Sequence, residues 1–150
     1  MISDKYGYKI LPEKGLILKY YCGSFTLQDF IVCTTDTALD SLYDSSFSVI
    51  NDFRDAAFSM GIKDLHEFVN LMKMNKNLYS KRSITFLTST PKQTVFTIML
   101  ELLKNEPLIN KKTFSTLTEA IKWLGYHPDE FASIENELEK LKNNLVTPSV

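Results

Sequence analysis

The sequence has few cysteines and histidines, and their positions exclude several classes of protein. Cys22 and Cys33 are the only cysteines, and their spacing matches neither a C-x-x-C redox pair nor a metal knuckle. We expect both to be reduced and buried as small hydrophobic residues. His66 and His127 are the only histidines, and no second histidine or cysteine stands at ligand spacing from either. The sequence therefore predicts no metal site, and we expect no cofactor.

The chain also lacks long apolar runs and an excess of one charge. No stretch approaches the roughly eighteen apolar residues of a membrane span, and the amino terminus lacks the pattern of a signal peptide. Seventeen basic residues against eighteen acidic ones give a net charge of -1. No overall field therefore attracts nucleic acid or an anionic membrane. We expect a cytoplasmic protein that has no membrane span and does not bind nucleic acid.

What the sequence does contain is an alternation of β-prone and amphipathic segments. Its 150 residues show no linker, repeat or low-complexity segment, so we predict one domain over residues 1–150. Strands are predicted at 6–11, 16–22, 47–50, 83–87 and 112–114, and the last of these is expected at or near a sheet edge. Helices are predicted at 26–40, 61–77, 90–103, 116–124 and 128–145. The first two strands are expected to form a hairpin around residues 12–15.

Three of these helices begin with a threonine followed three residues later by an acid or an amide. The pairs are Thr26 with Asp29, Thr90 with Gln93, and Thr116 with Glu119. Such pairs are typical of capping boxes, in which each side chain binds the backbone N–H of the other residue. Pro91 also suits the first position of its helix.

Two helices carry apolar stripes that must be buried. In helix 90–103 the stripe consists of Val95, Ile98, Met99 and Leu102, widened by Phe96 and Leu103. We expect this helix to be well buried. In helix 128–145 the stripe consists of Phe131, Ile134, Leu138, Leu141 and Leu145. That stripe packs either on its own sheet or on a second copy of the chain, and we favour a contribution to a homodimer.

Three short motifs accompany this order of elements. They are Gly23, Thr26 and Asp29 at the first helix, Asp52 and Arg54 at the central strand, and Phe114, Glu119, Ala120, Trp123 and Leu124 near the end. With these motifs, the order of elements resembles that of the SpoIIAA-like (STAS/SEC14-like) small bacterial proteins. The resemblance covers about residues 5–125. It implies an α/β fold of the STAS type, with a mixed β-sheet, an amino-terminal hairpin and alternating helices. The helix over 128–145 is then an addition to that core.

The resemblance also implies a regulatory role, with one departure. Anti-sigma factor antagonists of the STAS type carry a phosphorylated serine in a turn after the central strand. Here that region reads Asp52-Phe53-Arg54-Asp55-Ala56-Ala57, and the next hydroxyl belongs to Ser59. A phosphorylation switch of that kind is therefore not expected at this turn.

Asp52, Arg54 and Asp55 are the first candidate binding residues. They follow the predicted strand at 47–50, and ligands of open α/β sheets bind beyond the carboxyl ends of strands. The Arg54 guanidinium could bind a partner's carboxylate or a phosphate. The alternative, which we favour, is a local ion pair that ties the strand end to a neighbouring helix.

Further candidates lie beyond the central strand and after the strand at 83–87. Thr88, Ser89 and Thr90 lie at the start of a helix and could bind a phosphate or be phosphorylated, although plain capping is the favoured interpretation because the loop lacks glycines. Ser59, the first hydroxyl after the central strand, is a candidate binding residue, and Met60 belongs to a set of adaptable apolar groups that could line a pocket for an acyl chain. The other members of that set are Tyr20, Tyr21, Phe25, Phe58, Met72 and Met74. Such residues are more often simply core.

Two hypotheses of function follow. The first is a non-enzymatic STAS-like regulatory or protein-interaction module that binds a protein partner through the central strand end and the helix after it. The alternative is a carrier or sensor for a small apolar, lipid-like ligand, as the SEC14-like architecture suggests. An enzyme is not expected, because no G-x-S-x-G turn or comparable catalytic motif is present.

Overall fold

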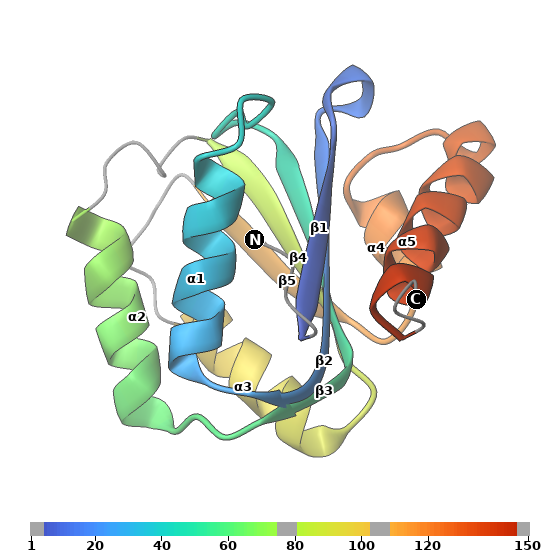
Figure 1. Ribbon diagram of the computed structural model, residues 1–150. Helices are drawn as coiled ribbons and strands as arrows, with labels where there is room; N and C mark the ends of the chain where they lie inside the picture. The colour runs from blue at the N-terminus through green and yellow to red at the C-terminus, as the bar shows by residue number, and fades with distance from the viewer. Residues whose placement is uncertain (1–4, 75–80, 103–108, 147–150) are drawn as a thin grey trace.

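The computed structural model describes residues 5–74, 81–102 and 109–146, and it is a mixed α/β fold. Its five-stranded sheet has the order β1-β2-β3-β4-β5 (Figure 1). The strands are β1 (Tyr6–Leu11), β2 (Leu16–Phe25), β3 (Ser48–Phe58), β4 (Arg82–Leu87) and β5 (Ile109–Phe114). The helices are α1 (Leu27–Ala38), α2 (Ile62–Met74), α3 (Pro91–Leu102), α4 (Leu117–Trp123) and α5 (Phe131–Val146). β1 pairs with β2 antiparallel, and every other neighbouring pair is parallel.

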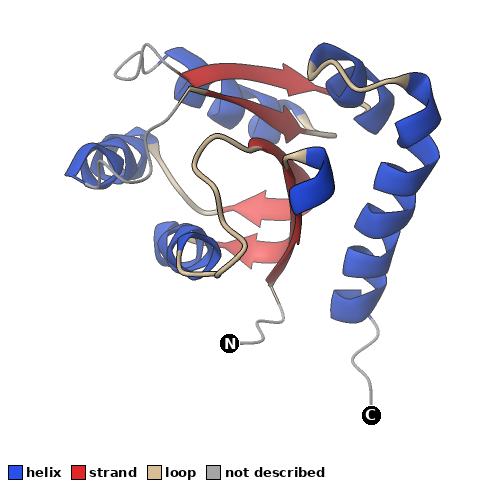
Figure 2. Ribbon diagram, turned by 90° about the horizontal axis from the view of Figure 1, so that it is seen from above, coloured by secondary structure: helices blue, strands red, loops and turns tan. Residues whose placement is uncertain are grey.

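The sheet lies between two layers of helices (Figures 1 and 2). Alternate residues of a strand point to opposite faces. On β2, Ile17 and Tyr21 face the layer of α1, α2 and α3, whereas Leu18 packs with residues of α4 and α5. The hairpin, the mixed sheet and the edge position of β5 are as the sequence predicts.

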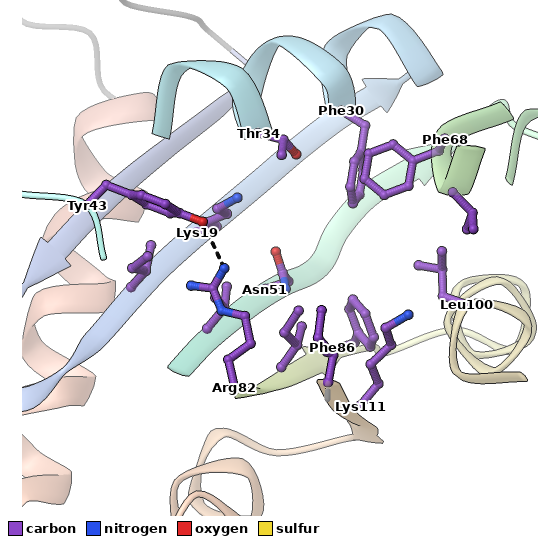
Figure 3. A pocket seen from close by; sticks show the side chains of 15 residues that line it. Lys19, Phe30, Thr34, Tyr43, Asn51, Phe68, Arg82, Phe86, Leu100 and Lys111 are labelled. Atoms are coloured by element: carbon purple, nitrogen blue, oxygen red, sulfur yellow. Dashed lines mark hydrogen bonds between the residues drawn. The ribbon is translucent and has the colours of Figure 1, made fainter. Parts of the chain in front are cut away.

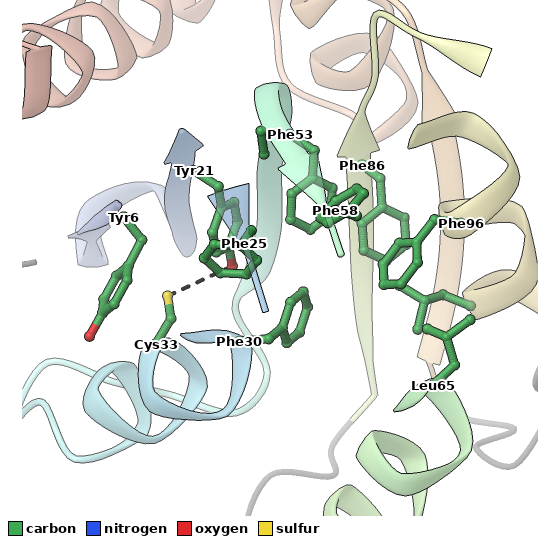
Figure 4. Packing of buried hydrophobic residues seen from close by; sticks show 12 residues of the cluster. Tyr6, Tyr21, Phe25, Phe30, Cys33, Phe53, Phe58, Leu65, Phe86 and Phe96 are labelled. Atoms are coloured by element: carbon green, nitrogen blue, oxygen red, sulfur yellow. Dashed lines mark hydrogen bonds between the residues drawn. The ribbon is translucent and has the colours of Figure 1, made fainter. Parts of the chain in front are cut away.

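The face toward α1, α2 and α3 has an aromatic core (Figure 4). Phe53 of β3 lies at its centre, with its ring centroid 4.6 Å from that of Tyr21 and 4.9 Å from that of Phe58. Phe58 also stacks on Phe96 of α3 at 4.3 Å. Burying each of these rings stabilises the fold by roughly 1.5–3 kcal/mol. Tyr21, Phe25 and Phe58, which we considered as pocket residues, are therefore core.

The central strand is longer than predicted. β3 runs from Ser48 to Phe58, so the prediction that the strand ends near residue 50 and that Asp52, Arg54 and Asp55 follow it is wrong. The strand continues because β2 extends to Phe25 and pairs with it along its whole length. Tyr20 pairs with Asp52 but Cys22 pairs with Asp55, so β3 carries a bulge at this place.

Helix α3 turns a different face to the sheet than the one predicted. Its buried side chains are Gln93, Phe96, Thr97 and Leu100, whereas Val95, Ile98 and Leu102 are exposed. The polar members of the buried face have hydrogen-bond partners, because Gln93 donates to the carbonyl oxygen of Ala56 at 2.7 Å and Thr113 donates to Thr97 at 2.9 Å. A helix that is apolar around most of its surface does not reveal its buried face by periodicity alone.

The helix starts agree with the sequence. Thr26 with Asp29 forms a full capping box, and the reciprocal bonds of Thr90 with Gln93 are also present, each at 3.2 Å. Thr116 accepts from the backbone N–H of Glu119. The predicted end of the second helix near residue 77, and Leu103 of the third, lie outside the described residues.

The carboxyl-terminal helix packs on its own sheet. A 3-10 turn at Pro128–Glu130 leads into α5, whose Ile134 and Leu138 are buried against β2 and α4. Leu141 lies so close to β1 that a Cβ at Gly7 would come within 2.9 Å of it. The stripe of α5 is thus covered within the chain, so it no longer argues for a homodimer.

Candidate functional site

The predicted polar group on β3 forms an ion-pair network inside the molecule. Asp52 is fully buried, and Arg54 binds both of its carboxylate oxygens, each at 2.9 Å. The ammonium of Lys142 on α5 lies 3.9 Å from the same carboxylate. The hydrogen bond to Asp52 raises the pKa of Arg54 above its ordinary value. This geometry matches the alternative of a local ion pair that ties the strand to a helix.

Asp55 is engaged on the same face of the sheet. The hydroxyl of Tyr20 donates to its carboxylate at 2.7 Å. Lys142 also lies over the ring of Tyr20, with the ammonium nitrogen 5.7 Å from the centroid. The side chains around Asp52 and Asp55 therefore connect β2, β3 and α5. Their contacts hold these three elements together.

Thr88 and Ser89 are held by the loop that connects β4 to α3. The hydroxyl of Ser89 donates to the carbonyl oxygen of Arg54 at 2.8 Å, and that of Thr88 lies 2.8 Å from the hydroxyl of Thr94. The side-chain oxygen of Gln93 accepts from the backbone N–H groups of Ser89 and Thr90. These amides are occupied, so the geometry is that of a helix cap rather than a phosphate cradle.

Ser59 and Met60 follow Phe58, the last residue of β3. Ser59 binds the carbonyl oxygen of Phe25 through its backbone N–H at 3.1 Å and its hydroxyl at 3.3 Å. Met60 packs against the aromatic core. Met74, by contrast, is exposed. The structure thus brings Asp52, Arg54 and Asp55 together, with Ser89 in contact with the backbone of Arg54, whereas Ser59 and Met60 lie after the end of β3.

A cavity that the sequence did not reveal lies between the sheet and helices α1, α2 and α3 (Figure 3). Its volume is about 110 Å³, and it is nearer to the amino-terminal ends of the parallel strands than to their carboxyl ends. Phe30, Phe68, Phe86 and Leu100 form its apolar end. Lys19, Tyr43 and Arg82 form its polar end.

Arg82 is fixed at the polar end by two hydrogen bonds. Its Nε donates to the carbonyl oxygen of Phe47 at 2.9 Å, and its Nη1 donates to the hydroxyl of Tyr43 at 3.0 Å. The guanidinium also lies over the Tyr43 ring, 5.6 Å from the centroid. The remaining nitrogen, Nη2, is buried and has no hydrogen-bond partner among the described residues. Buried polar groups are rarely left in this state.

Lys19 stands beside Arg82 in the middle of β2. Only 8% of the residue is exposed, and no described residue forms an ion pair or hydrogen bond with its ammonium group. Burial lowers the pKa of Lys19, and the charge of Arg82 lowers it further. Asn51, next along the cavity wall, is already satisfied by Tyr21 and by the carbonyl oxygen of Thr85. Three cationic residues therefore line the cavity: Lys19 and Arg82 are neighbours and almost completely buried, and Lys111 is half-buried and lies beside Phe86 (Figure 3).

Sequence reasoning missed this site although one signal was available. Lys19 interrupts the apolar run from Leu16 to Cys22, and Arg82 precedes the next buried strand. A charge within a buried strand is costly unless it is paired, so it indicates a functional or structural partner. The partners here come together only because β2 and β4 both flank β3.

Two further findings concern metal ions and membranes. Among residues 5–74, 81–102 and 109–146, no group of three or more His, Cys, Asp or Glu side chains could hold a metal ion. Within the same residues, none of the helices has the length and apolar character needed to cross a membrane.

The fold is similar to that of a solved structure. Comparison of the sequence with protein-family models and with curated proteins finds no match. Comparison of the structures finds an uncharacterized protein of the DUF3478 family from Shewanella loihica PV-4, described as having a SpoIIAA-like fold. The likeness has a TM-score of 0.53 at 13% sequence identity, and it covers 79% of this chain and 91% of that one. The five-stranded sheet and its two helical layers are therefore a SpoIIAA-like fold, as the sequence predicts.

Proposed function

We propose that this protein is a non-enzymatic binding module that holds a small ligand in the cavity between the sheet and α1, α2 and α3. This is the sensor or carrier alternative of the sequence analysis, moved to a different place. The observation that carries it is the cavity itself, in which an apolar wall faces two buried cations without ion-pair partners among the described residues. The described residues that line it include no Asp or Glu, so the lining itself supplies no carboxylate to these cations.

The size of the cavity restricts the ligand. A cavity of about 150 Å³ holds one benzene molecule in an engineered protein, so about 110 Å³ accommodates a group of similar or smaller size. Established drug-sized sites are several times larger. A long acyl chain does not fit, and the ligand of this proposal is compact rather than lipid-like.

Native mass spectrometry of protein purified gently from its own cells tests this proposal. Thr34 lines the cavity from α1, whereas its neighbour Thr35 is exposed. Thr34→Phe should fill the cavity and abolish an added mass that wild-type protein carries and loses on denaturation. Thr35→Phe is the matched control and should retain it. Absence of any added mass, and of any binding of benzene-sized probes by NMR titration, would overturn the proposal.

A second candidate function is a protein-interaction module, and the exposed face of α3 favours it. Val95, Ile98 and Leu102 are 57%, 43% and 66% exposed and recur at helical spacing. The binding surface of this second proposal is the exposed face of α3. The sequence had indicated the end of the central strand and the helix after it instead. Ile98→Glu should dissociate a complex formed by the wild-type protein, either a homodimer or a complex with another protein, without lowering its melting temperature. Sedimentation velocity measures this, with Lys92→Glu on the exposed side of the same helix as control.

A further inference from the structure

The polar end of the cavity has a positive charge without a close ion-pair partner. Lys19 and Arg82 are each 8% exposed, and no described residue forms an ion pair with either of them, although the charge of Arg82 acts on Asp44 and contributes to the lowered pKa of that carboxyl. Two buried like charges repel each other and both lose hydration, so the arrangement is costly in the empty protein. An anionic ligand reduces that cost, whereas a neutral ligand of the same shape does not.

The donors at this end are already oriented. The hydrogen bonds to Phe47 and Tyr43 hold the guanidinium of Arg82, which leaves Nη2 with its N–H groups unused. The ammonium of Lys19 supplies up to three more donors from β2, and Figure 3 shows both side chains converging near Tyr43. Because Arg82 is fixed before the ligand arrives, little side-chain entropy is lost on binding.

The size of the cavity distinguishes between anions. A carboxylate can place one oxygen against the ammonium of Lys19 and the other against Nη2 of Arg82. A phosphate group has three terminal oxygens and occupies more of a cavity of about 110 Å³, which also has to hold the apolar body of the ligand. The opposite wall of Phe30, Phe68 and Phe86 contacts the body of the ligand, which is therefore aromatic or compactly branched.

From this geometry we infer that the ligand is a small apolar carboxylic acid whose carboxylate binds between Lys19 and Arg82 while its apolar body packs against the phenylalanines of the cavity. The inference rests on the proposed function, since it names the chemical class of the ligand for the same cavity. It also assigns Lys19 as the residue that selects an acid over a neutral molecule.

Binding of benzoate, benzamide and phenylphosphonate to the purified protein tests the inference. Isothermal titration calorimetry or NMR titration gives the three dissociation constants, and benzoate should bind at least tenfold more tightly than benzamide. Lys19→Met should abolish most of this preference while leaving benzamide binding unchanged or stronger. Lys63→Met, which removes an exposed cation on α2, is the matched control and should behave as wild type.

The outcomes separate the inference from the proposed function. Equal affinities for benzoate and benzamide, both abolished by Thr34→Phe, would overturn the carboxylate preference and leave the binding module standing. Tighter binding of phenylphosphonate than of benzoate would overturn the choice of anion. If none of the three probes binds and no ligand is retained from cells, both proposals fail. Because Arg82 also holds Phe47 and Tyr43, the milder Arg82→Lys serves as a second variant and should weaken benzoate binding without unfolding the protein.

Discussion

Arg54 binds the buried carboxylate of Asp52 from two positions further along the same strand, with Nε to Oδ1 and Nη2 to Oδ2 both at 2.9 Å. Both side chains point toward α5, whose Lys142 approaches the same carboxylate. Asp52 is therefore fully enclosed, and its charge is compensated from one residue of its own strand and one of a distant helix. Removing either partner leaves a charge where water does not reach it.

We predict that Arg54→Glu unfolds the protein more easily rather than acting only on a partner. Breaking a buried ion pair by removing one member typically costs about 3–5 kcal/mol, and here the replacement also brings like charges together. Urea denaturation measures the free energy of unfolding, with Lys63→Glu on exposed α2 as the control for a change of charge. A loss below about 1 kcal/mol, the size typical of exposed pairs, would contradict the structural role. Replacing both members, as in Asp52→Asn with Arg54→Met, should cost less than Arg54→Glu alone.

Lys19→Met should make the protein more stable at neutral pH. It removes a buried cation that has no ion-pair partner among the described residues, and such replacements gain about 1–3 kcal/mol. Thermal unfolding followed by circular dichroism checks this. The same variant should bind benzoate more weakly, so stability and benzoate affinity change in opposite directions. A lower melting temperature for Lys19→Met would contradict the prediction.

The increase in the free energy of unfolding caused by Lys19→Met should also depend on pH. Burial lowers the pKa of Lys19 in the folded protein, so between that pKa and its ordinary value the unfolded chain binds more protons than the folded one. Wild-type stability therefore rises as pH increases through this window, and the advantage of Lys19→Met narrows. Denaturation curves of both proteins from neutral pH to pH 10 measure the difference. A constant difference would show that the folded and unfolded chains bind the same number of protons at Lys19, which would contradict a lowered pKa in the folded protein.

Tyrosine ionisation should destabilise the protein above about pH 10. Burial and a hydrogen bond to Asp55 raise the pKa of Tyr20, and burial and a hydrogen bond to Asp36 raise that of Tyr6. Burial and a hydrogen bond to Asp40 raise the pKa of Tyr8 to about 12. Groups with raised pKa values stabilise the fold fully below their unfolded pKa, and this contribution is lost as pH rises through the folded value. Absorbance of phenolate during alkaline titration should rise together with unfolding, and Tyr20→Phe should reduce stability by about 1 kcal/mol at pH 8.

Gln93→Leu should be among the most destabilising single substitutions in α3. Gln93 donates to the carbonyl oxygens of Ala56 and Arg54, and it accepts from the amides of Ser89 and Thr90. An apolar side chain of similar size removes all four hydrogen bonds, including the buried one to the carbonyl oxygen of Ala56, at a cost of about 2 kcal/mol or more. Lys92→Leu, at an exposed position next to it, is the control and should change the free energy of unfolding by less than about 0.5 kcal/mol.

The sequence predicted the order of elements because local signals determine it. Alternation and helical spacing place the strands and helices, and pairs such as Thr26 with Asp29 mark helix starts. The length of β3 was not predictable in this way, since Asp52, Arg54 and Asp55 are typical of a strand end. They continue the strand only because Lys142 and Tyr20, which are distant in sequence, compensate or bind them.

The candidate site was even harder to predict from the sequence than the length of β3, because tertiary contacts alone bring its residues together. The carboxyl end of β3 was the general expectation for an α/β sheet, yet the cavity lies near the opposite ends of the strands. Lys19 and Arg82 are each unremarkable in sequence, and only strand order brings them together. The buried face of α3 was missed for the same reason, because Gln93 and Thr97 are buried only where their hydrogen-bond partners lie on other elements.

The alternation of residues along β3 makes its length intolerant of change. Val49, Asn51 and Phe53 face the cavity and the aromatic core, while Ile50 and Asp52 face α4 and α5. Deleting or inserting one residue between Val49 and Asp52 reverses the faces of everything beyond it, so that Phe53 would meet Lys142 and Asp52 would enter the aromatic core. Among related sequences, β3 should therefore vary in the size and polarity of its side chains but not in the number of its residues.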